Sequence, residues 1–158
     1  MRWLDELIPD RFEYRAGVTY VGSRVEDLLE AGAGVCQDFA HLALVLLRRH
    51  GLAARYVSGY FFAPPPADAQ PDADSAEVDT HAWIEALIPA GAGAEPVWIA
   101  ADPTNSGLAG ERHVKIGHGR HYSDVPPIKG VFRGGASAEL DASVRMTRTD
   151  NARTAPAA

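Results

Sequence analysis

The sequence is short of the features that would assign it to several classes of protein. It contains one cysteine, Cys36, in 158 residues, which excludes an internal disulfide and a zinc site built from several cysteines. Its longest unbroken apolar run is six residues, Leu42 to Leu47, whereas a membrane-spanning helix needs about 20. We therefore expect no membrane-spanning segment and no role at a membrane.

A secretory signal and a nucleic-acid footprint are also missing. Asp5 and Glu6 interrupt the stretch that would have to form an apolar signal core, which together with the lone cysteine predicts a cytoplasmic protein. Residues 56–111 contain nine acidic residues and no Lys or Arg. No basic patch with interleaved aromatic residues occurs, so nucleic-acid binding is not expected.

The composition that remains is that of a folded globular protein. Hydrophobic residues make up 46% of the chain and charged residues 23%, which excludes disorder throughout. The length predicts one domain, over residues 1–148, followed by a flexible tail over residues 149–158.

The periodicity predicts helices first and strands after them. The capping-box spacing of Ser23 and Glu26 predicts a short helix from Ser23, and a helix over residues 36–50 is apolar nearly all round, as buried helices are. Proline and acidic residues predict a mobile loop over residues 63–78. Strands are expected over residues 55–62, 80–88 and 96–102, and weaker ones near 113–116, 128–132 and 140–146. The order predicts an α+β fold, with a buried helix on an antiparallel sheet.

Cys36 lies where a nucleophile is expected. Gly34 allows a tight turn, and Cys36 then opens the predicted buried helix. A helix N-terminus carries partial positive charge and unpaired amide hydrogens, which favour a thiolate and would stabilise a developing oxyanion. Taken alone, a free cysteine at such a position is more often a small buried side chain that packs the helix start.

A thiolate nucleophile needs a base, and the chain has six histidines. His41 lies about 140° round the helix from Cys36, so it is predicted to be a core histidine. His50 ends the helix, where it suits the negative end of the dipole.

His81 is the histidine with a predicted partner. If the strands that flank the Pro89–Ala94 turn form a hairpin in which Ile88 pairs with Glu95, Asp102 lies directly opposite His81 on the same face. Taken separately, His81 would be an edge histidine and Asp102 the opening of an Asp-Pro turn. Together with Cys36, they supply the nucleophile, base and orienting carboxylate of acyl transfer.

Four segments carry a family resemblance: GVCQDFAHLALVLLRRHGLAARYVSGYFF, DTHAWIEALI, VWIAADPTN and GRHYSDVPPIKGVFRG. They resemble the bacterial transglutaminase-like cysteine peptidases, and the similarity runs from about Phe12 to Met146. It implies a papain-like fold, in which a central helix bears the cysteine and an antiparallel sheet carries the histidine and the acid. It implies that Cys36, His81 and Asp102 are the catalytic residues. Members of the family commonly carry an all-β domain ahead of the core. This sequence begins almost at the core, so either that domain is absent or the sequence is a fragment of a longer protein that has it as a partner.

The resemblance has one local departure, and it bears on metal binding. The family usually has an aspartate in the GR-x-Y motif where this chain has His121. A metal site formed by His113, His118 and His121 is a weak hypothesis, because no acid or cysteine accompanies them at ligand spacing. The acids between residues 68 and 77 lack the ligand alternation and the glycine of a calcium loop. No metal and no cofactor are expected.

Two aromatic groups remain open in the interpretation. A second oxyanion donor besides the amide of Cys36 would be the hydroxyl of Tyr14 or of Tyr20. Trp83 shares the predicted face of His81, where it would either shield the His81–Asp102 pair or belong to the core.

The sequence thus predicts a cysteine-dependent hydrolase of peptide or amide bonds that acts through a thioester acyl-enzyme. The alternatives are a transglutaminase with an amine acceptor and a binding or scaffold module without chemistry. The expected partner is a peptide or protein substrate, neutral or basic because of the acidic middle of the chain.

Overall fold

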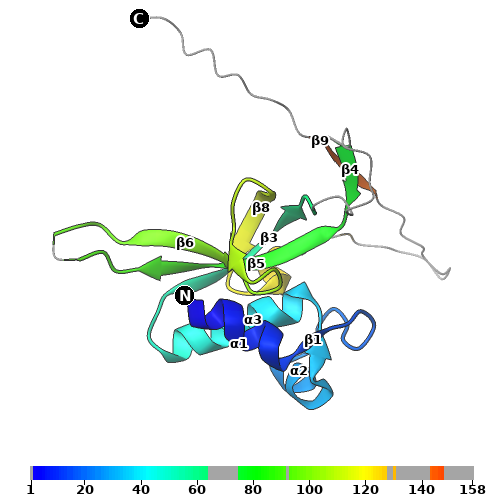
Figure 1. The fold of residues 1–158 in the computed structure, drawn as a ribbon, viewed down its shortest axis with the longest axis horizontal. Coiled ribbons are helices and arrows are strands. Elements are labelled where there is room, and N and C mark those ends of the chain that lie inside the picture. The colour runs from blue at the N-terminus through cyan, green and yellow to red at the C-terminus, as the bar shows by residue number, and fades with distance from the viewer. Residues whose placement is uncertain (1, 64–74, 92, 128–129, 131–142, 148–158) are drawn as a thin grey trace, which may run out of the picture.

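The computed structural model describes residues 2–63, 75–91, 93–127, 130 and 143–147. Three helices gather on one side of a five-stranded antiparallel sheet (Figure 1). They are α1 (Arg2–Arg11), α2 (Val25–Ala31) and α3 (Cys36–Arg49). The expected α+β fold, with a buried helix on an antiparallel sheet, is therefore confirmed.

The helix that begins at Cys36 agrees with its prediction, and the shorter helix begins later than expected. Helix α3 starts at Cys36 and His50 follows its last residue. Helix α2 starts at Val25, because Asp27 caps it by accepting a hydrogen bond from the amide of Arg24 at 2.7 Å. The predicted capping pair of Ser23 and Glu26 is wrong. Ser23 instead closes the preceding turn, where its hydroxyl accepts from the amide of Tyr20 at 3.0 Å.

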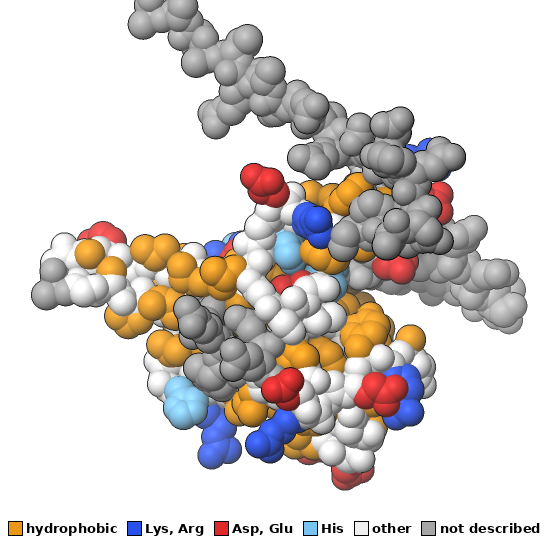
Figure 2. All heavy atoms as spheres, in the orientation of Figure 1, with side chains coloured by type: hydrophobic (Ala, Val, Ile, Leu, Met, Phe, Trp, Pro, Cys, Tyr) orange, Lys and Arg blue, Asp and Glu red, His pale blue; other side chains and the backbone are white. Residues whose placement is uncertain are grey.

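The central sheet has the strand order β7-β6-β5-β3-β8. Its strands are β3 (Ala54–Phe61), β5 (Thr80–Ile88), β6 (Val97–Asp102), β7 (Gly107–Leu108) and β8 (His113–Gly119). The hairpin of β5 and β6 projects beyond the helices (Figure 1), and hydrophobic side chains line its surface (Figure 2), among them the half-exposed Val97 and Trp98.

The hairpin of β5 and β6 is confirmed, but its register differs from the prediction. Ile88 pairs with Val97, not with Glu95, and Ile84 pairs with Ala101. The connection is therefore two residues longer than expected. Since a shift by two preserves the face of every side chain, Asp102 remains on the side of β5 that carries His81.

Two small pairs of strands complete the described structure. β1 (Glu13–Tyr14) runs parallel to β2 (Ala33–Gly34), just before Cys36. β4 (Ser75–Val78) pairs antiparallel with β9 (Val144–Thr147). The prediction of a loop over all of residues 63–78 is wrong at its end, because β4 finds a partner about 70 positions away in the chain. Residues 64–74, most of the strand expected near 128–132 and the tail over 149–158 lie outside the described residues, and the single domain over 1–148 stays a prediction.

The core lies between the helices and the sheet. It joins Ile8 of α1, Leu28 of α2 and the apolar side of α3 to alternate residues of β5, namely Ala82, Ile84 and Ala86. Packing of the apolar side of α3 against alternate β5 residues holds the start of α3 beside the start of β5. None of the described helices is long and apolar enough to cross a membrane.

Candidate active site

The turn before α3 is built around Gly34 and Asp38. A Cβ on Gly34 would lie 2.8 Å from Oδ2 of Asp38 and 2.8 Å from Cδ1 of Leu28, so this close approach requires glycine. The buried Asp38 carboxylate accepts hydrogen bonds from the amide of Val35 at 2.9 Å and from the hydroxyl of Thr19 at 2.6 Å. These contacts fix the first turn of the helix, and sequence reasoning missed them although Asp38 stands three residues after the helix-capping position.

Cys36 is the first residue of α3 and is half-buried. Its amide is among those at a helix N-terminus that have no intrahelical acceptor, and the thiol lies at the positive end of the helix dipole. Cys36 lies close enough to His81 to raise the pKa of that imidazole. The structure thus brings the predicted nucleophile and the predicted base together.

His81 contacts Asp102 on its other side. Its Nε2 atom donates to Oδ2 of Asp102 at 2.7 Å, and the two side chains are 10% and 1% exposed. Because Nε2 faces the carboxylate, Nδ1 is the ring nitrogen left for Cys36. The three residues that the sequence singled out therefore lie together, with His81 hydrogen-bonded to Asp102 and interacting with Cys36.

Asp102 accepts more hydrogen bonds than sequence reasoning suggested. Its Oδ1 atom accepts from the amides of Thr104 and Asn105 at 3.0 and 3.3 Å, which is the local geometry of the Asp-Pro turn. Its Oδ2 atom accepts from the side-chain amide of Asn105 at 2.6 Å and from Nε2 of His113 at 3.0 Å, in addition to His81. Every lone pair of this buried carboxylate is in use, as burial of a charge demands.

The charges of this cluster support one another. Burial by itself lowers the pKa of His81, but the hydrogen bond to Asp102, the interaction with Cys36 and the charges of both residues raise it to about 9. Burial by itself raises the pKa of Asp102, but hydrogen bonds from His113, His81 and Asn105 hold it well below its ordinary value. The site therefore favours an imidazolium at His81 beside an ionised Asp102.

Aromatic rings enclose the His81–Asp102 pair. Trp83 is 2% exposed and stacks on His81, with ring centroids 6.1 Å apart. Phe61 packs against His81 at 5.3 Å and against His113 at 4.8 Å. Trp83 thus shields the pair and is buried as well, so both sequence interpretations of this residue hold. Exclusion of water strengthens the electrostatic interactions inside the cluster.

The geometry of His81, Asp102 and His113 invites a test as a metal site. One ligand atom from each lies within 4.8 Å of the others. However, the amide of Gly110 donates to Nδ1 of His113 at 3.1 Å, which places the hydrogen of that ring on Nε2, the atom that a metal would need. The hydrogen bonds thus favour a proton-sharing cluster over a metal centre.

The metal hypothesis for His113, His118 and His121 is not supported, because the three rings face different partners. His118 contacts Arg55 at 3.3 Å, and His121 accepts from the amide of Ser123 at 3.2 Å. Among the described residues they form no ligand group.

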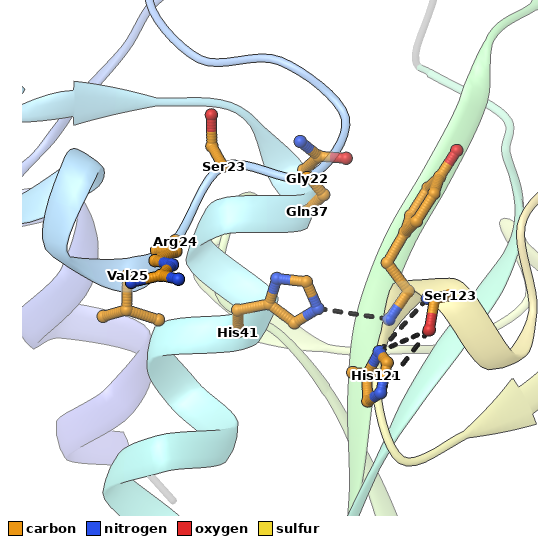
Figure 3. A pocket seen from close by; sticks show the side chains of 9 residues that line it. Gly22, Ser23, Arg24, Val25, Gln37, His41, His121 and Ser123 are labelled. Carbon is orange, nitrogen blue, oxygen red and sulfur yellow. Dashed lines mark hydrogen bonds between the residues drawn. The ribbon is translucent and has the colours of Figure 1, made fainter.

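His41 was predicted to be a core histidine, but it is only partly buried and is not part of the hydrophobic core. Its Nε2 atom accepts from the amide of Tyr122 at 3.2 Å, where the 3₁₀ helix η1 (Tyr122–Asp124) begins. Figure 3 shows this bond across a cavity of about 440 Å³ between α3 and η1. Burial is the main cause that lowers the pKa of His41, so its neutral ring can accept this bond.

Of the two candidates for a second oxyanion donor, Tyr14 lies near the thiol. Burial and then the nearby Cys36 raise the pKa of the Tyr14 hydroxyl. Tyr20 is 74% exposed, and the described structure gives its hydroxyl no contact with the site.

Comparisons with known proteins assign the chain to a family. The model of the transglutaminase-like superfamily core matches residues 2–103. The chain belongs to the transglutaminase-like superfamily. An uncharacterized protein of Mycobacterium tuberculosis is 41% identical over 147 residues, and one of Mycobacterium leprae is 41% identical over 138 residues.

A solved structure of this superfamily fold is also similar. A putative cysteine protease from Cytophaga hutchinsonii superposes with a TM-score of 0.68 at 32% identity and covers 93% of this chain. The chain spans 45% of the length of the M. tuberculosis protein and 44% of the solved chain. The chain thus spans less than half of the length of each of these two proteins.

Proposed function

We propose that this transglutaminase-like chain is a cysteine-dependent hydrolase of peptide or amide bonds. The observation that carries the proposal is the cluster at the N-terminus of α3, in which His81 is hydrogen-bonded to the buried Asp102 and interacts with Cys36. A buried carboxylate behind a histidine, and a thiol before it, is the arrangement that activates sulfur for attack on a carbonyl. The similarity to a putative cysteine protease is in line with it.

In the acylation half, His81 takes the proton of Cys36, and the sulfur attacks the carbonyl carbon of the substrate. A C–S bond forms, and the electron pair of the carbonyl moves to oxygen. Collapse of this intermediate breaks the C–N bond, and the His81 imidazolium gives its proton to the leaving amine. Asp102 holds the ring so that Nδ1 faces the sulfur and stabilises the imidazolium.

In the deacylation half, His81 removes a proton from water, which attacks the thioester carbonyl. The C–S bond breaks, the carboxylic acid leaves, and the thiolate–imidazolium pair is restored. The amide of Cys36 is placed to stabilise the oxyanion in both halves, and Tyr14 is the better candidate for a second donor because it lies near the thiol.

The alternative within the enzyme class is a transglutaminase, in which an amine replaces water as the acyl acceptor. The same cluster performs both reactions, since only the second nucleophile differs. The alternative of a non-catalytic binding module is less favoured, because a scaffold has no need for the fully hydrogen-bonded Asp102 behind His81.

The substrate class and the cytoplasmic location stay predictions. We propose a peptide or protein substrate that is neutral or basic. The acidic middle of the chain supports this only in part, because Arg55 and Lys115 neutralise Glu85, at 2.6 Å each, and Arg145 lies 3.6 Å from Glu77. Cleavage of matched peptides containing Lys, Ala or Glu, at low and high salt, would measure the preference.

The test of the proposed function uses the fact that Cys36 is the sole cysteine. The alkylation rate by iodoacetamide, followed by mass spectrometry from pH 4 to pH 9, reports the thiolate directly. We expect reaction well below pH 8.5, the ordinary pKa of a thiol, and thioester-dependent release of amine from a peptide library that is lost in Cys36→Ser. A rate equal to that of a small thiol at every pH, with no cleavage, would overturn the proposal. Transfer to an added amine that outpaces hydrolysis would favour the transglutaminase.

A further inference from the structure

His113 lies against the catalytic cluster although it is remote from it in the sheet. It opens β8 at one edge, whereas Asp102 closes β6 near the other, with β5 and β3 between them. Its Nε2 atom nevertheless reaches Oδ2 of Asp102 at 3.0 Å, and its side chain is 8% exposed. The carboxylate that orients His81 is therefore shared by two imidazoles.

The orientation of the His113 ring is fixed from both ends. The amide of Gly110 donates to Nδ1 at 3.1 Å, so the ring hydrogen lies on Nε2 and points at Asp102. Trp83 packs edge-on against the ring at 5.1 Å, and Phe61 covers it at 4.8 Å. A ring held in this way cannot turn its donor away from the carboxylate.

We propose that His113 is a positioning residue of this site, whose Nε2–H holds the Asp102 carboxylate ionised and directed at His81, and thereby strengthens the thiolate–imidazolium pair of Cys36 and His81. The inference rests on the proposed function, since it assigns His113 a part in activating the same thiol.

The balance of forces on Asp102 supports this role. Burial raises the pKa of this carboxyl. Among the interactions that lower the pKa, the hydrogen bond from His113 has the largest effect, ahead of those from His81 and Asn105. Without that donor, a carboxylate that is 1% exposed would take up a proton more readily and would turn more freely. Either change weakens the counter-ion of the His81 imidazolium.

Other titratable groups near the cluster do not replace this donor. They are Tyr14, Tyr56, Asp38, Asp79, Glu111 and Arg112. Burial is the main cause that raises the pKa of Tyr14 and of Tyr56, so both stay neutral from pH 4 to pH 9. Asp38 is held by Thr19 and Val35. The other three are exposed, where water and salt screen their charge.

The test compares His113→Gln with His113→Asn in the full chain. Gln places an amide N–H near the position of Nε2 and keeps a donor for Asp102. Asn reaches only the position of Nδ1, beside Gly110. The readout is the midpoint of the pH dependence of Cys36 alkylation, which needs no substrate. We expect His113→Asn to raise the midpoint by about one pH unit, equivalent to about tenfold in thiolate population, and His113→Gln to restore most of that shift.

Two further variants separate positioning from stability. His113→Phe fills the space without a donor and should shift the midpoint as Asn does. His118→Asn, at an exposed histidine of the same strand, should leave it unchanged. The inference would be overturned if both His113→Asn and His113→Phe lower the melting temperature but leave the alkylation midpoint unchanged or lower it. It would also be overturned if His113→Gln shifts the midpoint as far as His113→Asn does. A wild-type thiol without low-pH reactivity would instead refute the proposed function, so the two failures are distinct.

Discussion

Replacing Asp102 with Asn tests the carboxylate with little change of size. An amide can still accept from the backbone of Thr104 and Asn105 through its oxygen, but its NH₂ group would face the three donors that now meet Oδ2. To accept a hydrogen bond from this NH₂ group, Nε2 of His81 must lose its hydrogen, which moves the proton to Nδ1. That tautomer cannot take the proton of Cys36.

The structure bounds the size of the effect. Asp102 and Cys36 together raise the pKa of the nearly buried His81 from 6.5 to about 9, and such a shift corresponds to about 3 kcal/mol. The part due to Asp102 would be lost in Asp102→Asn. With the wrong tautomer added, we expect kcat/KM to fall by about 10²- to 10⁴-fold. Asp102→Ala should retain more activity than His81→Ala, because the imidazole remains.

The assay is peptide hydrolysis together with the pH dependence of Cys36 alkylation, in variants whose folding is checked by thermal melting. Glu85→Gln is the matched control, because it also removes a carboxylate from an ion pair in the same sheet, with Arg55 and Lys115. It should lower the melting temperature without changing the alkylation midpoint. Activity of Asp102→Asn within tenfold of the wild type, with an unchanged midpoint, would refute this account of Asp102.

Three other outcomes are expected. Gly34→Ala should destabilise the fold by about 1–3 kcal/mol, because its Cβ would lie 2.8 Å from Oδ2 of Asp38. Urea unfolding measures this loss, and an unchanged urea midpoint would show that the turn adjusts to the added Cβ without cost. Because the pKa of His81 is raised to about 9, its contribution to the free energy of unfolding should be complete below pH 6.5 and should be lost as the pH rises to 9. The free energy of unfolding of His81→Gln should lack this pH dependence. His41→Ala should lower the melting temperature, through loss of its bond to Tyr122, and leave Cys36 alkylation at its wild-type rate.

The local elements of this protein follow from the sequence because their signals are local. The bounds of the strand over residues 80–88 are those of β5, and the buried helix begins at Cys36 as expected. Alternation of apolar residues and an apolar helix surface are properties of a few neighbouring residues. The α+β class follows from the order of these elements alone.

The register of the hairpin was not available from the same signals. A turn of two residues fixes the pairing of its strands, but the connection between Ile88 and Val97 is longer and leaves several registers open. The prediction that His81 and Asp102 share a face survived because the error was an even number of residues. Their contact is diagonal, and packing of β5 and β6 in the sheet selected it.

Only the tertiary structure decided which groups surround Asp102 and which basic residues pair with acidic residues of the stretch 56–111. His113 is 11 residues from Asp102, and no periodicity or spacing marks it as a donor to that carboxylate. The partners of Glu85, from β3 and β8, likewise come from outside the acidic stretch. The sequence determined which residues have reactive side chains and which elements carry them. Which charges meet depends on how strands far apart in the chain are placed side by side, because hydrogen bonds and ion pairs act only over a few ångströms.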